Sequence, residues 1–341
     1  MKRDINNILV IGHRNIGDIL QNLSVLKPLK KSFPHSTVFF VTSPHGVELL
    51  KGNPYVSKTF IYRKDFKNKF KRIFHVLELI LKLRAVKFDI IINLKSGSYL
   101  HFFLRKKNTW RISSLNQKDE TKRIKHAIDS YLDVLEEKKL IFSRNDIDMR
   151  IVTDATEKNK VNMLLKSCGY DFKKKIVVFI PFANWSAKEW SLLYYGELAK
   201  RITTQCGYQV VFVGGADDRH KINAVEAYKS YFIDFVGKLS LRELSALYER
   251  TYVAIGGDTG PFHLACNMNV IPLCLFGATS YKRARPYFHP DNIVICEKDI
   301  GCNPCYPGKK PHECKIYHDM TPCMKEIQQD KVFQKFLQVT Q

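Results

Sequence analysis

Residues 252–264 read Tyr-Val-Ala-Ile-Gly-Gly-Asp-Thr-Gly-Pro-Phe-His-Leu, a short apolar run followed by a glycine-rich turn. Pro261 stands where the first turn of a helix is expected. Backbone N–H groups at such a turn, together with the helix dipole, suit a pyrophosphate. A tight structural turn alone explains the glycines, but it does not readily explain Asp258, Thr259 and His263 standing together. Asp258 and His263 are therefore candidate ligands for a nucleotide or for sugar hydroxyls.

The same alternation of strand and helix extends in both directions from this turn. Short apolar runs separated by helical stretches predict an α/β protein with parallel sheets that are covered by helices on both faces. The runs form two series, so we expect two separate doubly wound, Rossmann-like domains with a junction near 150–172. A length of 341 residues agrees with two domains. The expected strands lie at 8–12, 37–42 and 89–93, and then at 176–181, 209–215, 233–237, 252–257 and 270–277.

Two further turns follow expected strands. The first runs from Gly12 to Asp18 and lacks the GxGxxG spacing of a dinucleotide site. Asp18 is either an acid that stabilises the start of a helix or a functional carboxylate. The second turn covers 181–190, at a strand's carboxyl end, where open α/β sheets bind ligands. Its Lys188 is either an ordinary surface lysine or a point charge that binds phosphate.

Four of the nine cysteines are clustered near the end of the chain. Their spacing, which includes one CxxC pair, is typical of a tetrahedral metal site for Zn or Fe. Such a site is structural, because four thiolates leave no open position for catalysis. The alternative is a set of free or redox-active thiols. The cluster consists of Cys302, Cys305, Cys314 and Cys323.

The chain is strongly basic, with a formal net charge of +22. This charge favours an anionic partner such as a nucleic acid, a membrane surface or a phosphorylated substrate, although it also serves solubility. No zinc-finger, RNP or helix-turn-helix pattern supports nucleic-acid binding. There is no secretory signal and no apolar stretch of the length a transmembrane helix needs, so we expect a cytoplasmic protein.

One basic segment, 62–87, has its own pattern. Phe66, Phe70, Phe74, Leu77 and Leu81 recur at helical spacing among many lysines and arginines, which predicts a basic amphipathic helix or helix pair. The aromatic and aliphatic stripe faces either the protein core or an anionic lipid or polysaccharide. The basic residues are Lys64, Lys67, Lys69, Lys71, Arg72, Lys82, Arg84 and Lys87.

Taken in order along the chain, these motifs resemble glycosyltransferase family 9, the ADP-heptose:lipopolysaccharide heptosyltransferases. The similar features are the opening strand with Ile16-Gly17-Asp18-Ile19-Leu20, the Trp185-x2-Lys188-x-Trp190 turn, Gly214-Gly215, the Gly257–His263 turn, and Phe276-Gly277-Ala278-Thr279. The cysteine cluster also resembles one that a subset of the family carries.

The resemblance implies a GT-B fold, with two Rossmann-like domains and the active site in the cleft between them. We expect an acceptor-binding domain at 1–158, a donor-binding domain at 172–325 that includes the cysteine segment 302–323, and a helix at 326–341 that packs back on the first domain. The resemblance further implies inversion at the anomeric carbon without a catalytic metal or other cofactor.

The resemblance also implies roles for individual residues. Asp18 would be the general base that deprotonates the acceptor hydroxyl, and Lys188 would stabilise the leaving diphosphate. Arg14, Asn15 and Gly17 would contact the acceptor. The residues expected to bind the donor are Asn184, Ser186, Lys188, Gly214, Gly215, Asp258, Thr259, Gly260, Pro261 and His263.

The implied reaction moves a heptose or related sugar from ADP-heptose to a lipid-linked, anionic lipopolysaccharide core. The enzyme would then work at the inner face of the cytoplasmic membrane as a peripheral protein. The segment 182–186 is bulkier and more aromatic than the family's usual loop, which leaves the donor open. The alternatives are a GT-B transferase with another acceptor such as protein, a sugar-nucleotide epimerase, and a nucleic-acid-binding protein.

Overall fold

The computed structural model describes residues 5–63, 65–66, 68–95, 100–104, 108–111, 125–305, 314 and 320–341. The chain folds into two compact units, Met1–Val152 and Thr153–Gln341. The division falls inside the expected junction near 150–172. Residues 153–158, which we had assigned to the first domain, lie in the second unit.

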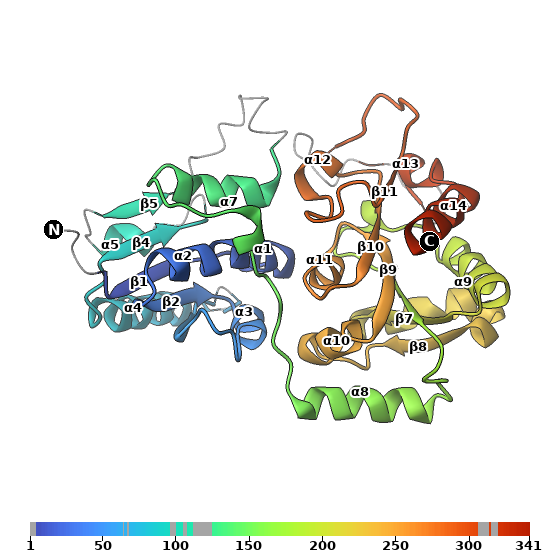
Figure 1. The fold of residues 1–341 in the computed structure, drawn as a ribbon, viewed down its shortest axis with the longest axis horizontal. Helices are drawn as coiled ribbons and strands as arrows, with labels where there is room; N and C mark the ends of the chain where they lie inside the picture. Colours follow the sequence, from blue (N-terminus) through green and yellow to red (C-terminus); the bar gives the residue numbers. More distant parts are fainter. Residues whose placement is uncertain are drawn as a thin grey trace. The chain divides into compact units, whose positions relative to one another are not determined.

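The first unit is built on a five-stranded parallel sheet with the order β3-β2-β1-β4-β5 (Figure 1). Helix α4 covers one face, where Leu79, Ile80 and Leu83 pack with Leu9 and Ile11 of β1. Helices α1, α2 and α7 lie on the other face (Figure 1). The strands are β1 (Asn7–Ile11), β2 (Thr37–Thr42), β3 (Lys58–Ile61), β4 (Ile90–Asn93) and β5 (Thr109–Arg111). The helices are α1 (Ile16–Asn22), α2 (Leu26–Ser32), α3 (Pro44–Leu49), α4 (Lys69–Arg84), α5 (Leu100–Phe103) and α7 (Ala127–Glu136).

The second unit contains a six-stranded parallel sheet with the order β11-β10-β9-β6-β7-β8. From β6 the chain builds outward through β7 and β8, and it then returns to the other side of β6 for β9, β10 and β11. This is the strand order of a Rossmann fold, and it puts the topological switch point between β6 and β9. The strands are β6 (Ile176–Ile180), β7 (Gln209–Gly214), β8 (Phe232–Val236), β9 (Thr251–Gly257), β10 (Ile271–Phe276) and β11 (Ile293–Ile295). The helices are α8 (Ala155–Ser167), α9 (Leu192–Cys206), α10 (Leu241–Tyr248), α11 (Gly260–Cys266), α12 (Tyr281–Ala284), α13 (Pro322–Lys325) and α14 (Gln329–Thr340), and 3-10 segments are η3 (Ser186–Lys188) and η4 (Ala216–Tyr231).

The C-terminal helix α14 corrects one expectation. We expected residues 326–341 to pack on the first domain, but Val332, Phe333 and Phe336 are buried in the hydrophobic core of the second unit. Just before this helix, the carbonyl of Ile327 accepts a hydrogen bond from Trp190 Nε1 at 2.8 Å. The apolar stripe of α14 is thus used to complete the core of the second unit.

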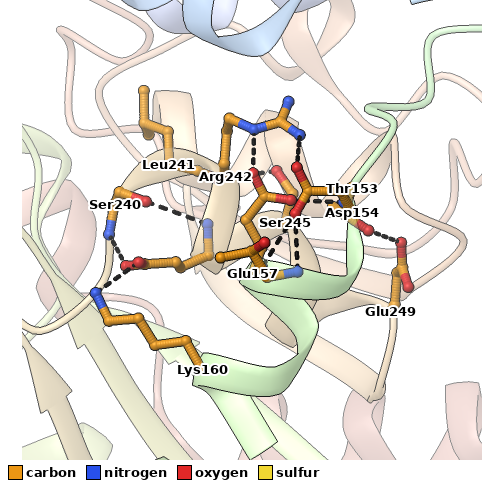
Figure 2. A network of polar contacts seen from close by, with 11 residues as sticks. Thr153, Asp154, Glu157, Lys160, Ser240, Leu241, Arg242, Ser245 and Glu249 are labelled. Atoms are coloured by element: carbon orange, nitrogen blue, oxygen red, sulfur yellow. Dashed lines mark hydrogen bonds and ion pairs between the residues drawn. The ribbon is translucent and has the colours of Figure 1, made fainter. Parts of the chain in front are cut away.

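A buried ion pair fixes α8 to α10 within the second unit (Figure 2). Arg242 Nε lies 2.5 Å from Glu157 Oε1, and the two side chains are only 8% and 11% exposed. Asp154 caps the start of α8 and also lies near the guanidinium of Arg242. Nearby, Lys160 pairs with Glu243 at the protein surface. These contacts explain why α8 belongs to the second unit.

Replacing Arg242 by Met is expected to lower the unfolding free energy of the second unit by about 3 kcal/mol, because Glu157 would remain buried without its partner charge. Urea unfolding measures this loss. The matched control is Lys160→Met on the same pair of helices. Lys160 is 54% exposed, so that change is expected to cost less than about 1 kcal/mol. Equal losses in the two variants would contradict the importance of the buried pair.

Candidate active site

Two loops of the second unit meet where the strand order reverses. The loop after β6 carries Lys188, and the turn after β9 carries Asp258. Lys188 Nζ donates to the backbone carbonyl of Asp258 at 2.8 Å and to its carboxylate Oδ2 at 3.0 Å. His263 Nε2 lies 2.9 Å from the other carboxylate oxygen. Three of the residues singled out in the sequence therefore form one contiguous cluster at the switch point.

The cluster is charged although it is largely buried, with the Asp258 side chain only 12% exposed. Burial by itself raises the pKa of Asp258, but the hydrogen bond from His263 and the charge of Lys188 outweigh it and hold the pKa of this carboxyl below its usual range. Asp258 is therefore ionised at neutral pH. Its carboxylate fixes the Lys188 ammonium in place at the end of the sheet.

Two glycines at the end of β9, Gly256 and Gly257, are required by close packing. A Cβ on Gly257 would lie 2.8 Å from the carbonyl oxygen of Lys188, and one on Gly256 would lie 2.8 Å from that of Ile180. The absence of side chains here lets β9 approach both β6 and the lysine loop.

Thr259 has a structural role that was not predicted. It is the N-cap of α11, and its hydroxyl accepts a hydrogen bond from the N–H of Phe262. Gly260 and Pro261 form the first helical turn, and the carbonyl of Pro261 accepts from the Tyr248 hydroxyl. Because proline has no N–H and Thr259 caps Phe262, this turn presents fewer backbone donors than its sequence indicates.

The ends of β6 and β7 are also brought together. A Cβ on Gly214 would lie 2.4 Å from the Phe182 ring, so only glycine permits this contact. The neighbouring Gly215 donates its N–H to Asp218. Asn184 and Ser186 lie exposed on the lysine loop.

Sequence reasoning missed the ion pair that orders the lysine loop. Glu189 Oε1 accepts from the N–H of Ala183 at 2.9 Å and from Lys221 Nζ at 3.0 Å. Lys221 also lies over the Phe182 ring. No spacing rule links Glu189 to a lysine of η4, because tertiary structure alone brings them together.

In the first unit, the turn after β1 is held by Asn22. Its Oδ1 accepts from the N–H of His13 at 2.9 Å, while the Gly12 N–H bonds to the carbonyl of Val41. The hydroxyls of Thr42 and Ser43 bond to the carbonyls of His13 and Arg14. The turn is therefore tied both to β2 and to the end of α1.

Asp18 lies in the first turn of α1 and is half-buried. The N-cap position belongs to Asn15, whose side-chain amide donates to Asp18 Oδ2 at 3.2 Å. Gly17 precedes Asp18 in the same turn. The structure thus places Asp18 as an acid in the first turn of α1, in agreement with the structural interpretation of this residue, while Asn15 holds the N-cap position. The Asp18 carboxylate is held by a neighbouring side chain.

Arg14 carries an unusual donor. Its Nε is buried and has no hydrogen-bond partner among the residues the structure describes. A buried, unsatisfied guanidinium N–H is costly, and an anionic ligand would satisfy it. This turn and the Lys188 loop both follow the first strand of a Rossmann-like sheet, β1 and β6 respectively.

Comparison with known families decides what kind of protein carries these turns. The family Glycosyltransferase family 9 (heptosyltransferase) matches residues 76–316, more than half of the chain. The chain belongs to this family. The matched range includes Lys188, Asp258 and His263. This family 9 enzyme is therefore a glycosyltransferase, as its motifs predicted.

Individual relatives agree with this assignment. Lipopolysaccharide heptosyltransferase 3 of Escherichia coli K12 is 26% identical over 295 residues, which is 82% of this chain and 84% of the relative. The family 9 glycosyltransferase of Veillonella parvula superposes with a TM-score of 0.82 at 21% identity, covering 99% of this chain and 98% of that chain. The expected GT-B fold, with two Rossmann-like units in one chain, is thereby confirmed.

The cysteine segment of this family 9 transferase is anchored beside the lysine loop. The Cys305 N–H bonds to the carbonyl of Ala278, and the Thr321 hydroxyl bonds to the carbonyl of Ala187 and contacts Cys323 Sγ. Burial raises the pKa of the Cys305 thiol to about 11, and the nearby Cys302, Cys323 and Cys314 add to the rise. Residues 306–313 and 315–319 of the predicted cysteine segment lie outside the described residues.

The metal expected at these thiols is not established by the geometry. Within the described part of the chain, no group of three or more His, Cys, Asp or Glu side chains is arranged to hold a metal ion. One more distant fold neighbour, the transferase TibC of enterotoxigenic Escherichia coli, is described as iron-containing and has been solved with ADP-D-β-D-heptose. It superposes with a TM-score of 0.60 at 13% identity, covering 99% of this chain and 76% of that chain.

Proposed function

We propose that this glycosyltransferase moves a heptose from ADP-heptose to a lipopolysaccharide core acceptor, with inversion at the anomeric carbon. The observation that carries the proposal is the Lys188–Asp258–His263 cluster at the switch point of a Rossmann-ordered sheet. A preorganised cation at this place suits a nucleoside diphosphate. The family's name and those of its relatives indicate heptose as the sugar.

In this proposal the second unit binds the donor. A lysine ammonium has three N–H donors, and Asp258 takes two of those of Lys188. The third is available to a phosphate oxygen. As the bond from the anomeric carbon to the diphosphate breaks, negative charge grows on the leaving oxygen, and the fixed ammonium stabilises it. The other donor contacts are assigned to Asn184, Ser186, Gly214, Gly215, Asp258, Thr259, Gly260, Pro261 and His263.

The first unit binds the acceptor in the same proposal. The attacking group is a neutral sugar hydroxyl, so a base must take its proton as its oxygen bonds to the anomeric carbon. Asp18 is assigned this role, because its half-buried carboxylate lies in the turn after β1 and is oriented by Asn15. Arg14, with its unsatisfied Nε, is assigned to an anionic group of the acceptor. Asn15 and Gly17 complete the acceptor contacts.

No metal is needed for this chemistry. We assign a structural Zn or Fe to Cys302, Cys305, Cys314 and Cys323, because their spacing, with one CxxC pair, is typical of a tetrahedral site for these metals. When bound, the ion would cross-link the segment that supports the lysine loop through Thr321 and Ala187.

Purified protein is therefore expected to contain about one Zn or Fe per chain, and Cys302→Ser is expected to lose it. Because the metal contributes folding energy, the variant should also melt several degrees lower. Elemental analysis and calorimetry measure the two effects. Cys168→Ser replaces an exposed cysteine outside the cluster and should change neither. The metal site would be contradicted if the wild type were purified without metal and melted at the same temperature as Cys302→Ser.

The place of action follows from the acceptor. A lipopolysaccharide core is anchored in lipid and carries phosphate, so we place the enzyme at the cytoplasmic face of the inner membrane as a peripheral protein. The net charge of +22 suits both the anionic acceptor and an anionic surface. No nucleic acid is required as a partner.

A thermal-shift screen of nucleotide sugars tests the proposed donor. A true donor binds the native state and stabilises it by about 2.7 kcal/mol at one hundred times its Kd. ADP-heptose is expected to raise the melting temperature most, with ADP-glucose and UDP-sugars as controls. A shift with UDP-sugars alone would overturn the ADP-heptose assignment. If none of the nucleotide sugars raised the melting temperature, the proposed donor site would be overturned.

A further inference from the structure

Helix α4 has two apolar faces, and among the residues that the structure describes only one of these faces packs on the protein. Leu79, Ile80 and Leu83 are buried against the first sheet, with Val76 beside them. The opposite face carries the aromatic and aliphatic side chains that recur at helical spacing. They are strongly exposed: Phe70 81%, Ile73 54%, Phe74 71%, Leu77 53% and Leu81 66%.

This result decides between two interpretations of the sequence. The stripe predicted through Phe66, Phe70, Phe74, Leu77 and Leu81 was either core-facing or directed at an anionic partner. Phe66 lies before the start of α4 and packs against His75, so the four residues on the helix decide the question. The core-facing interpretation is wrong, because the core takes the other side of the helix. The predicted cations Lys64 and Lys67 lie outside the described residues. Large apolar side chains in a row on a surface mark a site of interaction.

The apolar surface extends beyond α4 onto α5. Phe102 and Phe103 of α5 are 56% and 49% exposed. Arg84 at the end of α4 donates from Nε to the carbonyl of Phe103 at 3.0 Å, so the C-terminal end of α4 lies next to α5. We call the exposed side chains of α4, with Phe102 and Phe103, the outer stripe.

Positive charge borders the outer stripe at both ends of α4. The helix carries five cations against one acid, Glu78, which gives 5 − 1 = +4 without His75. Glu78 pairs with Lys82. A hollow beside the helix, lined in part by Lys58 and Arg63 of the neighbouring β3 region, adds further positive charge. The cations of α4 are Lys69, Lys71, Arg72, Lys82 and Arg84.

This combination fits one class of partner. A helix that presents aromatic and aliphatic side chains between lysines and arginines binds at the interface of an anionic bilayer, where the apolar groups enter the acyl boundary and the cations meet lipid phosphates. A second copy of the chain fits poorly, because two surfaces of the same sign would face each other. None of the helices that the structure describes is long and apolar enough to cross a bilayer.

We propose that the outer stripe of α4 and α5 is the membrane-docking surface of this enzyme, and that its partner is a bilayer rich in anionic phospholipid. The inference rests on the proposed function for its purpose, since a lipid-linked acceptor is presented at such a bilayer. The docking itself is independent of the donor site. It places the acceptor-binding unit at the membrane through its own helix.

Vesicle flotation tests the proposal directly. The wild type is expected to float with vesicles of phosphatidylglycerol and phosphatidylethanolamine, but not with phosphatidylcholine alone. The variant Phe70→Ser/Phe74→Ser/Leu77→Ser should lose at least tenfold in partitioning to the anionic vesicles. The matched control, Ile141→Ser/Met163→Ser/Leu193→Ser, removes three exposed apolar side chains elsewhere and should float like the wild type.

A series of charge variants separates docking through α4 from a nonspecific attraction between the net positive charge of the protein and anionic vesicles. Lys69→Gln/Lys71→Gln/Arg72→Gln should weaken flotation several-fold, while Lys229→Gln/Lys298→Gln/Lys335→Gln, with the same change in net charge, should not. Equal flotation of the outer-stripe variant and its control overturns the proposal. The proposal is also overturned if the wild type is a dimer and the outer-stripe variant is a monomer that floats as well as the wild type.

Activity on a delipidated core oligosaccharide distinguishes failure of the docking proposal from failure of the proposed function. The outer-stripe variant should keep the wild-type kcat on that acceptor and lose activity only when the acceptor is embedded in vesicles. An equal loss on both acceptors overturns the docking role. Absence of heptosyl transfer in the wild type would overturn the proposed function, while its flotation would still report on the docking surface.

Discussion

Replacing Asp18 by Asn is expected to lower kcat by about 10³-fold, within the range that general-base catalysis supplies. The amide keeps the size of the carboxylate and its contact with Asn15, but it cannot take the proton of the acceptor hydroxyl. Donor binding should not change, because the donor contacts are assigned to the second unit. Steady-state kinetics with ADP-heptose and a delipidated core acceptor measure kcat, and thermal shift with ADP measures donor binding.

Asp129→Asn is the matched control for this variant. Asp129 also lies in the first turn of a helix of the first unit, α7, so the charge change and its position in the helix are the same. This control should retain near wild-type kcat. If Asp18→Asn also retained it, Asp18 would be a structural residue of the helix start and the base would lie elsewhere.

Lys188→Met should lower kcat/KM by about 10²–10³-fold, comparable to the loss of one preorganised donor from a charge-stabilising site. Both binding of the diphosphate and stabilisation of the leaving group depend on this ammonium, so the donor KM should rise while kcat falls. Lys188→Arg should recover only part of the activity, because a planar guanidinium cannot reproduce the two bonds to Asp258.

A structural cause for the Lys188 effect must be separated from a catalytic one. Lys188→Met leaves the buried Asp258 carboxylate with its His263 hydrogen bond but without the Lys188 charge, which costs stability. In Lys188→Met/Asp258→Asn the buried charge is gone, and the melting temperature should recover. Recovery of stability without activity supports the electrostatic role. Recovery of both would show that Lys188 acts only by neutralising Asp258.

The fold class and the positions of the turns could be predicted from sequence because they depend on local patterns. Apolar runs of strand length, each ending in glycine or a polar turn, fix where parallel strands stop. The Lys188 loop and the Asp258 turn meet because β6 and β9 are neighbours, which follows from Rossmann strand order. The roles assigned to the site residues stay predictions until the variants are measured.

Contacts between distant segments could not be predicted in this way. A helix with apolar residues on two sides does not reveal which side the sheet will cover, and α4 was therefore ambiguous. The packing of α14 was misplaced for the same reason, since Val332, Phe333 and Phe336 fit any apolar surface. Asn22 and Glu189 order the two functional turns through partners that no sequence spacing marks.

The supports of the lysine loop have a consequence for synthesis of the enzyme. Ala187 is hydrogen-bonded to Thr321, which follows it by 134 residues, and Trp190 is hydrogen-bonded to Ile327, which follows it by 137 residues. A nascent chain in which all six strands of the second unit have emerged from the ribosome still lacks these hydrogen bonds. We therefore expect stalled or prematurely terminated chains that end after β11 to bind nucleotide weakly, so that truncated translation products would not compete with the finished enzyme for donor.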